Sequence, residues 1–567
     1  MKTVTIKLPV SPDSPPEATD PALLQAAALE AGLTSEDVTA VVIRRRSLDA
    51  RARRRPMWVI RADVFDTLDG PPDLSLPPVI RPRHLARPHP QLRPVIVGMG
   101  PAGLFAALRF ADFGIKCTIL DRGAAVQERN LHVRDLRVSG VLDPESNLCF
   151  GEGGAGTYSD GKLYTRGKSP RVREVYERLV ALGLARRILV DGHPHVGTNR
   201  LIPMMKVLRN ALLEAGHELL FDACMTDLVI RDAGPDPAVD RATVAGVVVA
   251  DGREIIGTPV LLATGHSARD TYRMMAGHGV QMQRKPFAIG ARVEHPQALI
   301  DDVQLGPLAG WASVGAAEYF VRQQVDSAVG KRGVYSFCMC PGGFVLPSPT
   351  VLDHLNVNGM SNSNRGGRFA NAALVMQVMP GDMYLDAPGD LDDDPDFGAH
   401  VADGALAGIA LQGILERRAY QLGGGGYRAP AQRLVDFVAD RGAGELPERT
   451  SYRPGVQAAD LRGLFPTRFG LGLQDAARRI DSRQLRGYLS DEAQIIGAET
   501  TTSSPVRVLR GDDRQSTSHA GLYPCAEGAG YAGGIVSSAI DGMLSAEAIM
   551  AAAGIEVAEE PAVAKQA

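Results

Sequence analysis

The sequence has few cysteines and lacks long apolar runs. Its six cysteines are scattered over 567 residues and none belongs to a C-x-x-C pair, so neither a disulfide framework nor the dithiol of a disulfide reductase is indicated. The N-terminal residues contain no apolar stretch of signal-peptide length, and nowhere do eighteen apolar residues follow one another. We therefore expect a soluble, cytoplasmic protein without a membrane-spanning segment.

A strong net charge and metal-binding clusters are also missing. The formal net charge is -4 and the pI about 6.3, so the overall charge favours neither nucleic acid nor a membrane as a partner. No group of histidines, cysteines and carboxylates has the spacing of a metal site, and His193 and His195 in GHPH are typical of a turn. We expect no metal ion.

The clearest motif of the chain is rich in glycine. A short β-branched run at 95–97 predicts a buried strand, and Gly98, Gly100 and Gly103 follow it with the spacing G-x-G-x-x-G. These glycines permit a tight turn, the approach of a pyrophosphate and the close packing of the following helix. Asp121 ends the next predicted strand about 20 residues later, where a carboxylate accepts hydrogen bonds from an adenosine ribose. The motif predicts a dinucleotide site and does not distinguish NAD from FAD.

Further glycine-rich stretches predict contacts with the same ligand. Residues 149–166 (CFGEGGAGTYSDGKLYTR) combine glycines, among them Gly151, Gly153, Gly154 and Gly156, with hydrogen-bonding side chains, which favours contact with a ring or a phosphate. Residues 258–265 predict a buried strand that ends in an Ala-Thr-Gly turn. Residues 526–535 (AEGAGYAGGI) open an apolar helix, whose free N–H groups would face electron-rich ligand atoms such as the pyrimidine edge of a flavin.

The N-terminal residues have the pattern of a separate small domain. Strands are predicted at 3–8, 38–43 and 57–64 and a helix at 21–31, an order similar to a ferredoxin-like unit. Seven prolines then mark a stiff linker. We expect the N-terminal domain at 1–65, the linker at 66–93, the first part of a nucleotide-binding domain at 94–279, an inserted substrate domain at 280–490, the second part of the nucleotide-binding domain at 491–555 and a tail at 556–567.

Within the nucleotide-binding domain, a pair of strands is predicted at 218–230 and 243–250, and Asp251-Gly252 after the second strand is typical of a two-residue hairpin turn.

A dense basic run lies between the last two predicted strands of the N-terminal domain. It consists of Arg44, Arg45, Arg46, Arg51, Arg53, Arg54 and Arg55. Such a run can bind RNA or phosphate, or it can be the solvated end of a hairpin. No aromatic residues alternate with the arginines for base stacking, which favours the hairpin end.

The glycine-rich motifs, in this order, resemble FAD-binding proteins of the glutathione-reductase structural type. The resemblance implies that Asp121 meets the ribose, that Met225 gives backbone contacts to adenine and that Glu527 meets the ribityl chain. That group usually carries Gly-Asp at the last motif, so the acid of this chain is one methylene longer.

The chain is similar in more detail to the uncharacterised FAD-dependent dehydrogenases, distant relatives of flavoproteins that reduce carbon–carbon double bonds. The segments that carry this resemblance are RRSLDAR, GMGPAGLFAAL, FGEGGAGTYSDGKL, IGARVEHP, FCMCPGGFV, VNGMS, ETTTSSPVRVLR and GLYPCAEGAGYAGGIVSSAIDG. Thr501 is a departure, because the subgroup usually carries an arginine there. The resemblance implies fold, cofactor and reaction class, and no particular substrate.

The expected fold is α/β. It comprises an FAD/NAD(P)-binding, Rossmann-like domain of the glutathione-reductase type, an inserted α+β substrate domain and a small ferredoxin-like N-terminal domain. The motifs and the resemblance together predict non-covalent contacts with FAD at Gly98, Gly100, Pro101, Ala102, Gly103, Asp121, Arg122, Gly153, Gly154, Thr157, Ser159, Asp160, Lys162, Met225, Ala263, Thr264, Gly265, Glu527, Gly528, Gly534 and Ile535.

Candidate catalytic groups lie in the inserted domain. Arg292 could hold an anionic substrate and Glu294 could move a proton, or the two could be a structural ion pair. Cys338 and Cys340 would face one side of a regular strand, as redox thiols or as packing residues. A separate group that could line a substrate pocket or cap a loop comprises Asn358, Ser361 and Arg365.

The predicted function is that of an FAD-dependent oxidoreductase, a dehydrogenase or reductase that uses the flavin as hydride carrier for an unidentified organic substrate of small or medium size. No second G-x-G-x-x-G follows a strand, so either NAD(P)H visits the flavin transiently as donor or the organic substrate itself reduces it. Two alternatives remain open: a flavoprotein that binds or modifies RNA through its arginine-rich domain, and a flavin redox sensor without turnover. The sequence points to no particular oligomeric state.

Overall fold

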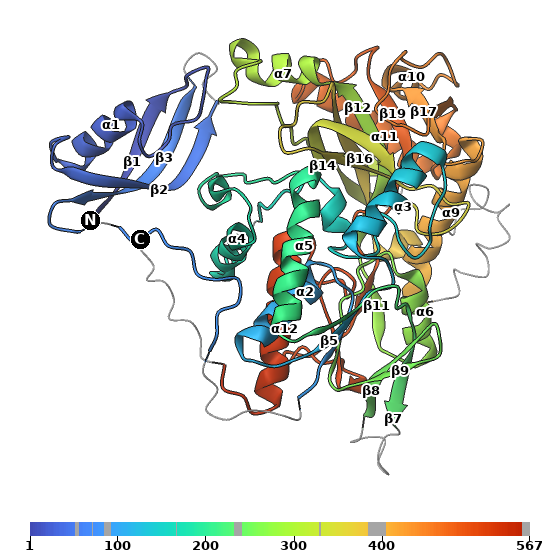
Figure 1. Cartoon of the computed structure of the whole chain (residues 1–567). Helices are drawn as coiled ribbons and strands as arrows, with labels where there is room; N and C mark the ends of the chain where they lie inside the picture. Colours follow the sequence, from blue (N-terminus) through green and yellow to red (C-terminus); the bar gives the residue numbers. More distant parts are fainter. Residues whose placement is uncertain are drawn as a thin grey trace.

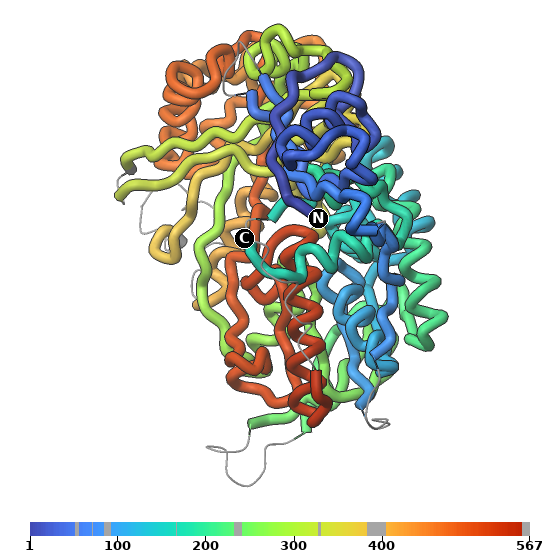
Figure 2. Tube along the Cα trace, turned by 90° about the vertical axis from the view of Figure 1, so that its left-hand side faces the viewer, coloured from blue at the N-terminus to red at the C-terminus, as the bar shows by residue number. Residues whose placement is uncertain are grey.

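A computed structural model of the chain describes residues 1–50, 56–70, 72–83, 92–165, 167–231, 241–327, 330–383 and 404–557. It shows a mixed α/β protein, with a small N-terminal domain, a domain around a parallel sheet and a larger, mostly antiparallel sheet (Figure 1). Figure 2 shows the antiparallel sheet at one end of the molecule and the parallel-sheet domain at the other.

The parallel sheet has the strand order β22-β10-β4-β5-β6. Its strands are β4 (Val95–Val97), β5 (Thr118–Leu120), β6 (Glu218–Leu220), β10 (Val260–Leu262) and β22 (Leu522–Pro524). The residues of β4, β10 and β22 are buried and mostly apolar, as expected of parallel strands covered on both faces. The helices of this domain are α2 (Pro101–Asp112), α3 (Val126–Ser139), α4 (Arg171–Ala181), α5 (Thr198–Glu214), α6 (Arg269–Gly277) and α12 (Ile535–Ala552). Helix α12 packs along α2, so the two ends of the sequence build one domain.

The strand predicted at 218–230 is two strands in two different sheets. After β6 the chain turns at Asp222, whose φ of 51° lies in the left-handed region, and continues as β7 (Met225–Arg231). β7 belongs to a four-stranded sheet with β8 (Ala242–Val249), β9 (Glu254–Ile256) and β21 (His519–Ala520). The single-strand prediction was wrong because apolar periodicity does not reveal a change of sheet.

The mostly antiparallel sheet, here called the insert sheet, has the order β13-β14-β16-β12-β19-β17-β18, with β15 paired to β14. Its strands are β12 (Phe287–Pro296), β13 (Arg322–Ser327), β14 (Gly330–Pro347), β15 (Val357–Ser361), β16 (Phe369–Val378), β17 (Ala429–Arg433), β18 (Val456–Ala458) and β19 (Gln494–Glu499). β19 lies between β12 and β17, so the insert sheet extends past residue 490.

Helices pack against the insert sheet around the largest apolar core. They are α7 (Gln297–Leu305), α9 (Ala407–Leu422), α10 (Leu434–Val438) and α11 (Thr467–Arg483). The pair β11 (Met282–Arg284) and β20 (Val506–Val508) joins this part to the parallel-sheet domain. Short 3₁₀ segments are η1 (Ala155–Tyr158), η2 (Arg186–Leu189), η3 (Gly306–Leu308), η4 (Pro380–Met383), η5 (Gly404–Leu406) and η6 (Leu461–Gly463).

The N-terminal domain is a three-stranded antiparallel sheet of order β1-β3-β2 with one helix. Its elements are β1 (Lys2–Pro9), α1 (Pro21–Ala31), β2 (Val38–Asp49) and β3 (Met57–Asp66). The carboxylate of Asp20 accepts the backbone N–H of Ala22 at the start of α1, and Gly32 ends the helix with φ 68°. A ferredoxin-like unit has four strands and two helices, and the described residues of this domain form three strands and one helix of that pattern.

The basic run is only partly within the described residues. Arg44 pairs with Asp63, and Arg46 is buried and pairs with Glu17 and Asp191. Arg46 therefore fastens the N-terminal domain to the chain near η2. Outside the described residues lie Arg51, Arg53, Arg54 and Arg55 of the basic run and Pro71, Pro88 and Pro90 of the predicted linker.

Among the described residues, α12 is the one helix long and apolar enough to cross a membrane. More than half of its most apolar window is buried within the protein, where it packs against α2. The core helix of a folded domain passes the same test of length and composition.

Candidate cofactor site

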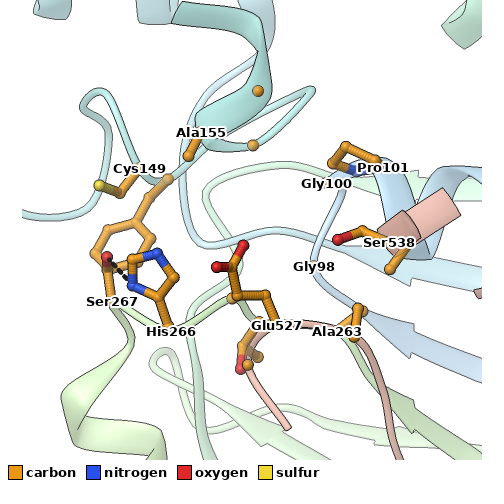
Figure 3. A pocket seen from close by; sticks show the side chains of 18 of the residues that line it. Gly98, Gly100, Pro101, Cys149, Ala155, Ala263, His266, Ser267, Glu527 and Ser538 are labelled. Carbon is orange, nitrogen blue, oxygen red and sulfur yellow. Dashed lines mark hydrogen bonds between the residues drawn. The ribbon is translucent and has the colours of Figure 1, made fainter. Parts of the chain in front are cut away.

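A cavity of about 400 Å³ opens at the carboxyl ends of the parallel strands, within the usual size of ligand sites. Gly98 follows β4, Asp121 follows β5, Ala263 follows β10 and Ala526 is two residues beyond β22, and all of them line the cavity. Figure 3 shows these turns around the cavity, with the glycine-rich stretch that contains Ala155 facing them. Strand ends far apart in the sequence thus converge on one site.

The first glycine motif brings backbone close to backbone. Gly98 has φ 105°, and a Cβ there would lie 2.4 Å from the carbonyl oxygen of Ala263. A Cβ on Gly103 would lie 2.0 Å from the carbonyl oxygen of Gly98, so α2 packs directly on the turn. At Gly100 a Cβ would meet only the Cα of Gly154, at 3.9 Å, and the remaining space belongs to the cavity.

Two helices begin at the cavity. Helix α2 starts after Gly100 and α12 starts after Gly534, and a glycine has no side chain to cap the first N–H groups. These N–H groups and the positive ends of both helices therefore remain available to electron-rich ligand atoms.

Asp121 ties loops together at one end of the cavity. Its carboxylate accepts the backbone N–H groups of Met99 (2.7 Å), Gly123 (3.0 Å) and Gly151 (2.8 Å). The next residue, Arg122, lies over the ring of Phe150 at 4.5 Å from its centroid. Arg122 also donates hydrogen bonds to the carboxylates of Glu145 and Asp270, with N···O distances of 2.6 to 3.0 Å.

The last glycine-rich turn is held by a buried carboxylate that sequence reasoning missed. Asp541 of α12 accepts the N–H of Ala526 at 2.7 Å and pairs with Arg510 and Arg514 at 2.7 to 2.9 Å. Burial by itself would raise the pKa of Asp541, but hydrogen bonds to Arg510 and Arg514 and the charge of Arg510 hold it well below its usual value. Ala526 has φ 56°, and the following Glu527 points its carboxylate into the cavity (Figure 3).

The glycine-rich stretch after α3 is fastened to the insert sheet. Asp160 is buried, pairs with Arg365 at 2.6 Å and accepts a short hydrogen bond from Ser361. Burial raises the pKa of Asp160, and the charges of Arg365 and Lys162 more than offset this and lower it. Lys162 donates to the carbonyl of Met339 on β14. Asp160 and Lys162 line the cavity, and these contacts hold the insert against its open side.

Most of the predicted cofactor residues line this cavity. Besides the residues already placed there, they are Pro101, Ala102, Arg122, Gly154, Ser159, Met225, Thr264, Gly265, Gly528, Gly534 and Ile535. Gly103, Gly153 and Thr157 lie behind its wall, where a Cβ on Gly153 would meet Thr157 Oγ1 at 2.0 Å.

The structure places the guanidinium of Arg292 behind the cavity wall. Arg292 is fully buried and pairs with Glu499 through two bonds of 2.6 and 2.7 Å. It also donates to Cys338 O, Asn371 and Asn358, of which Asn358 lines the cavity. These partners occupy a guanidinium that was predicted to hold substrate.

Glu294 is likewise buried away from the cavity. It accepts hydrogen bonds from Thr450, from Ser451 and from the side-chain amide of Gln494. Burial raises the pKa of Glu294 despite these bonds. The predicted partnership between Arg292 and Glu294 is not formed, because Arg292 pairs with Glu499.

Further cavity residues were not predicted one by one, although several of them lie within the glycine-rich stretches 149–166 and 526–535. They are Val97, Cys149, Phe150, Ala155, Gly156, Gly161, Tyr164, Ala223, Cys224, His266, Ser267, Ala268, Thr271, Phe337, Thr502, Ala526 and Ser538. His266 and Ser267 follow the Ala-Thr-Gly turn directly, and Figure 3 shows the 3.3 Å contact between Ser267 Oγ and His266 Nδ1. Their position beside a predicted turn was the one available signal.

Comparisons with known proteins agree with this picture. Residues 286–502 match the family described as FAD-dependent protein, C-terminal domain-like, and residues 1–65 match a domain of unknown function. An uncharacterized protein of Clostridium beijerinckii is 36% identical over 528 residues, which are 91% of this chain and 93% of that protein.

Solved structures resemble the chain more remotely. Glycerol-3-phosphate dehydrogenase from Bacillus halodurans, complexed with FAD, is 13% identical with a TM-score of 0.33, over 84% of this chain and 67% of that chain. A flavocytochrome c3 fumarate reductase is 12% identical with a TM-score of 0.33, over 82% of this chain and 79% of that chain.

Proposed function

Because this chain belongs to the family of FAD-dependent proteins, we propose that it is an oxidoreductase that acts on an organic substrate between its FAD-binding turns and the insert sheet. FAD is its cofactor. When bound, FAD supplies two-electron redox chemistry, and the protein supplies position and electrostatics.

The residues of the cavity fit FAD. The turn at Gly98 and Gly100 and the start of α2 suit the pyrophosphate, because they offer N–H groups and an open face. Among the described residues no side-chain partner of the Glu527 carboxylate is found, so it is available to ribityl hydroxyls. The start of α12 suits the pyrimidine edge of the flavin, and Asp121 and Met225 suit the adenosine.

The single observation that carries the proposal is the position of the insert sheet. Phe337, Cys338 and Asn358 of this sheet and Thr501 beyond β19 line the same cavity as the FAD-binding turns. A domain that served only to bind FAD would not need this wall. A wall in this position would shield the reacting end of the flavin from water.

An anaerobic absorbance titration of the FAD-loaded protein with NADPH and with NADH tests the proposal. We expect the flavin band to bleach with one of them, and we expect steady consumption of that donor once an artificial electron acceptor is added. If neither donor bleaches the band, the same assay is run with reduced metabolites as donors. A protein that cannot be loaded with FAD, or that turns over with no donor of either kind, would contradict the proposal.

A further inference from the structure

Cys338 and Cys340 lie on a distorted part of β14. The pairing of β14 with β16 shifts register between Phe337 and Cys340 and again between Cys340 and Gly343. Cys338 itself has φ 47°, a conformation that a residue other than glycine rarely adopts. Bulges next to functional sites re-aim side chains. A regular strand would have kept both thiols on one face, and the bulge instead brings Cys338 to the cavity.

The two cysteines now have different surroundings but stay close together. Cys338 lines the cavity and is partly exposed, whereas Cys340 is fully buried behind it. The thiol of Cys340 lies 3.3 Å from the carbonyl oxygen of Cys338. Residues two apart in the chain are at most about 7 Å apart at Cα when the backbone is extended, close to the range of about 4.4 to 6.8 Å that a disulfide spans.

Charges near Cys338 favour its thiolate. A hydrogen bond from the Cys340 thiol, together with the positive charges of Arg292 and Lys162, lowers the pKa of Cys338 although burial opposes it. The same interaction, with burial, raises the pKa of Cys340. Arg292 donates to the carbonyl of Cys338 at 3.1 Å and Lys162 to that of Met339, so both cations are fixed beside the bulge.

We propose that Cys338 and Cys340 form a redox-active thiol pair whose substrate is a small disulfide that enters the cofactor cavity. The inference rests on the proposed function, because it names a substrate class for that oxidoreductase. It requires no C-x-x-C motif, because Cys338 and Cys340 are only two residues apart along β14.

The exchange proceeds in two balanced steps. The Cys338 thiolate attacks one sulfur of the disulfide, the S–S bond breaks, one thiolate leaves and a mixed disulfide forms on Cys338. Cys340 gives its proton to the departing thiolate and attacks the Cys338 sulfur, which releases the second thiolate. The two cysteines are oxidised to a disulfide, and the small disulfide is reduced to one thiol and one thiolate, which takes up from water the proton that Cys338 released when it ionised.

The test uses the full-length, FAD-loaded protein and oxidised glutathione. After incubation, acid quenching and alkylation, mass spectrometry is expected to find the peptide that contains both cysteines unalkylated and two hydrogen atoms lighter than its reduced form, as an internal disulfide requires. In the reduced protein, iodoacetamide is expected to modify Cys338 at pH 7 roughly tenfold or more faster than Cys224, a cavity cysteine whose pKa burial raises to about 12.

Two substitutions separate the roles of Cys340. Cys340→Ser keeps an O–H donor, so the pH at which Cys338 alkylation is half-maximal is expected to stay low. Cys340→Ala removes the donor and is expected to raise that pH by about one unit. Both variants are expected to stop at the mixed disulfide of Cys338 with glutathione. Cys117→Ser, which changes a buried cysteine outside the cavity lining, is the matched control and is expected to leave the alkylation of Cys338 unchanged.

The proposal is overturned if wild-type protein forms no internal disulfide or accumulates only the mixed disulfide. It is also overturned if Cys338 titrates at the ordinary thiol value of about 8.5. Flavin bleaching with NAD(P)H is measured on the same samples. Bleaching without an internal disulfide refutes the thiol pair alone, and an internal disulfide without any flavin turnover refutes the proposed function alone.

Discussion

Replacing Asp541 by asparagine tests how the last glycine-rich turn is held. Asp541 is 9% exposed at its side chain and accepts five hydrogen bonds, two from Arg510 and one each from Arg514, the N–H of Ala526 and the thiol of Cys525. Removing one charge of a buried ion pair is destabilising by about 3 to 5 kcal/mol, and the amide keeps some hydrogen bonds, so we expect about 3 kcal/mol for Asp541→Asn.

The same substitution should weaken FAD binding. Ala526 holds a left-handed conformation that is unfavourable by about 1 to 2 kcal/mol, and its N–H bond to the Asp541 carboxylate stabilises that conformation. A hydrogen bond to a charged group contributes about 1.5 to 3 kcal/mol. Loss of this bond releases the turn that carries Glu527, so the Kd for FAD should rise about tenfold.

The assays are urea unfolding followed by flavin fluorescence and an FAD titration at pH 7. The pKa of Asp541 is lower in the folded protein than in the unfolded chain, so its stabilisation is present above about pH 4 and is lost as the pH falls below it. The difference between wild type and Asp541→Asn should therefore shrink in acid. Asp251→Asn, which changes an exposed turn pair with Arg253, is the control and should leave stability almost unchanged. Wild-type unfolding and wild-type FAD affinity in Asp541→Asn would refute this account of the turn.

Three further predictions follow from single residues. Gly100→Val should fold, since a Cβ at Gly100 meets only the Cα of Gly154, but it should lose FAD, with the flavin-to-protein absorbance ratio after loading as the measure; retained FAD would mean that the pyrophosphate lies elsewhere. Glu499→Gln should destabilise the insert by about 3 to 5 kcal/mol, because it leaves Arg292 as a buried charge without its ionic partner. Limited proteolysis should therefore cleave the insert faster in Glu499→Gln than in Glu492→Gln, a control at an exposed position. Equal cleavage rates would contradict the pairing. Burial lowers the pKa of His295 to about 4, so between about pH 6.5 and 4 the unfolded chain binds a proton that the folded protein does not bind. The free energy of unfolding should therefore fall by about 3 kcal/mol over that pH range. Thermal melting of His295→Asn should show a smaller loss of stability over the same range, and an unchanged loss would exclude His295 as its source.

The local sequence was enough to predict the elements around the cofactor. The strand at β4, the glycine turn, α2, β5 and Asp121 are neighbours in the chain, so spacing alone places them. The same holds for the Ala-Thr-Gly turn and the start of α12, because glycines and helix starts have local conformational requirements. Those turns meet around one cavity because parallel strands put their carboxyl ends at one edge.

The remaining features depend on contacts between distant segments, and only the tertiary structure decides them. Arg292 was predicted beside Glu294, but it pairs with Glu499, which is 207 residues away in sequence and lies on the neighbouring strand β19. The thiols of Cys338 and Cys340 were predicted on one face of a strand, and the bulge against β16 separates them into a cavity residue and a buried one. Register and bulges are set by which strands pair, and periodicity within one strand carries no information about its partner.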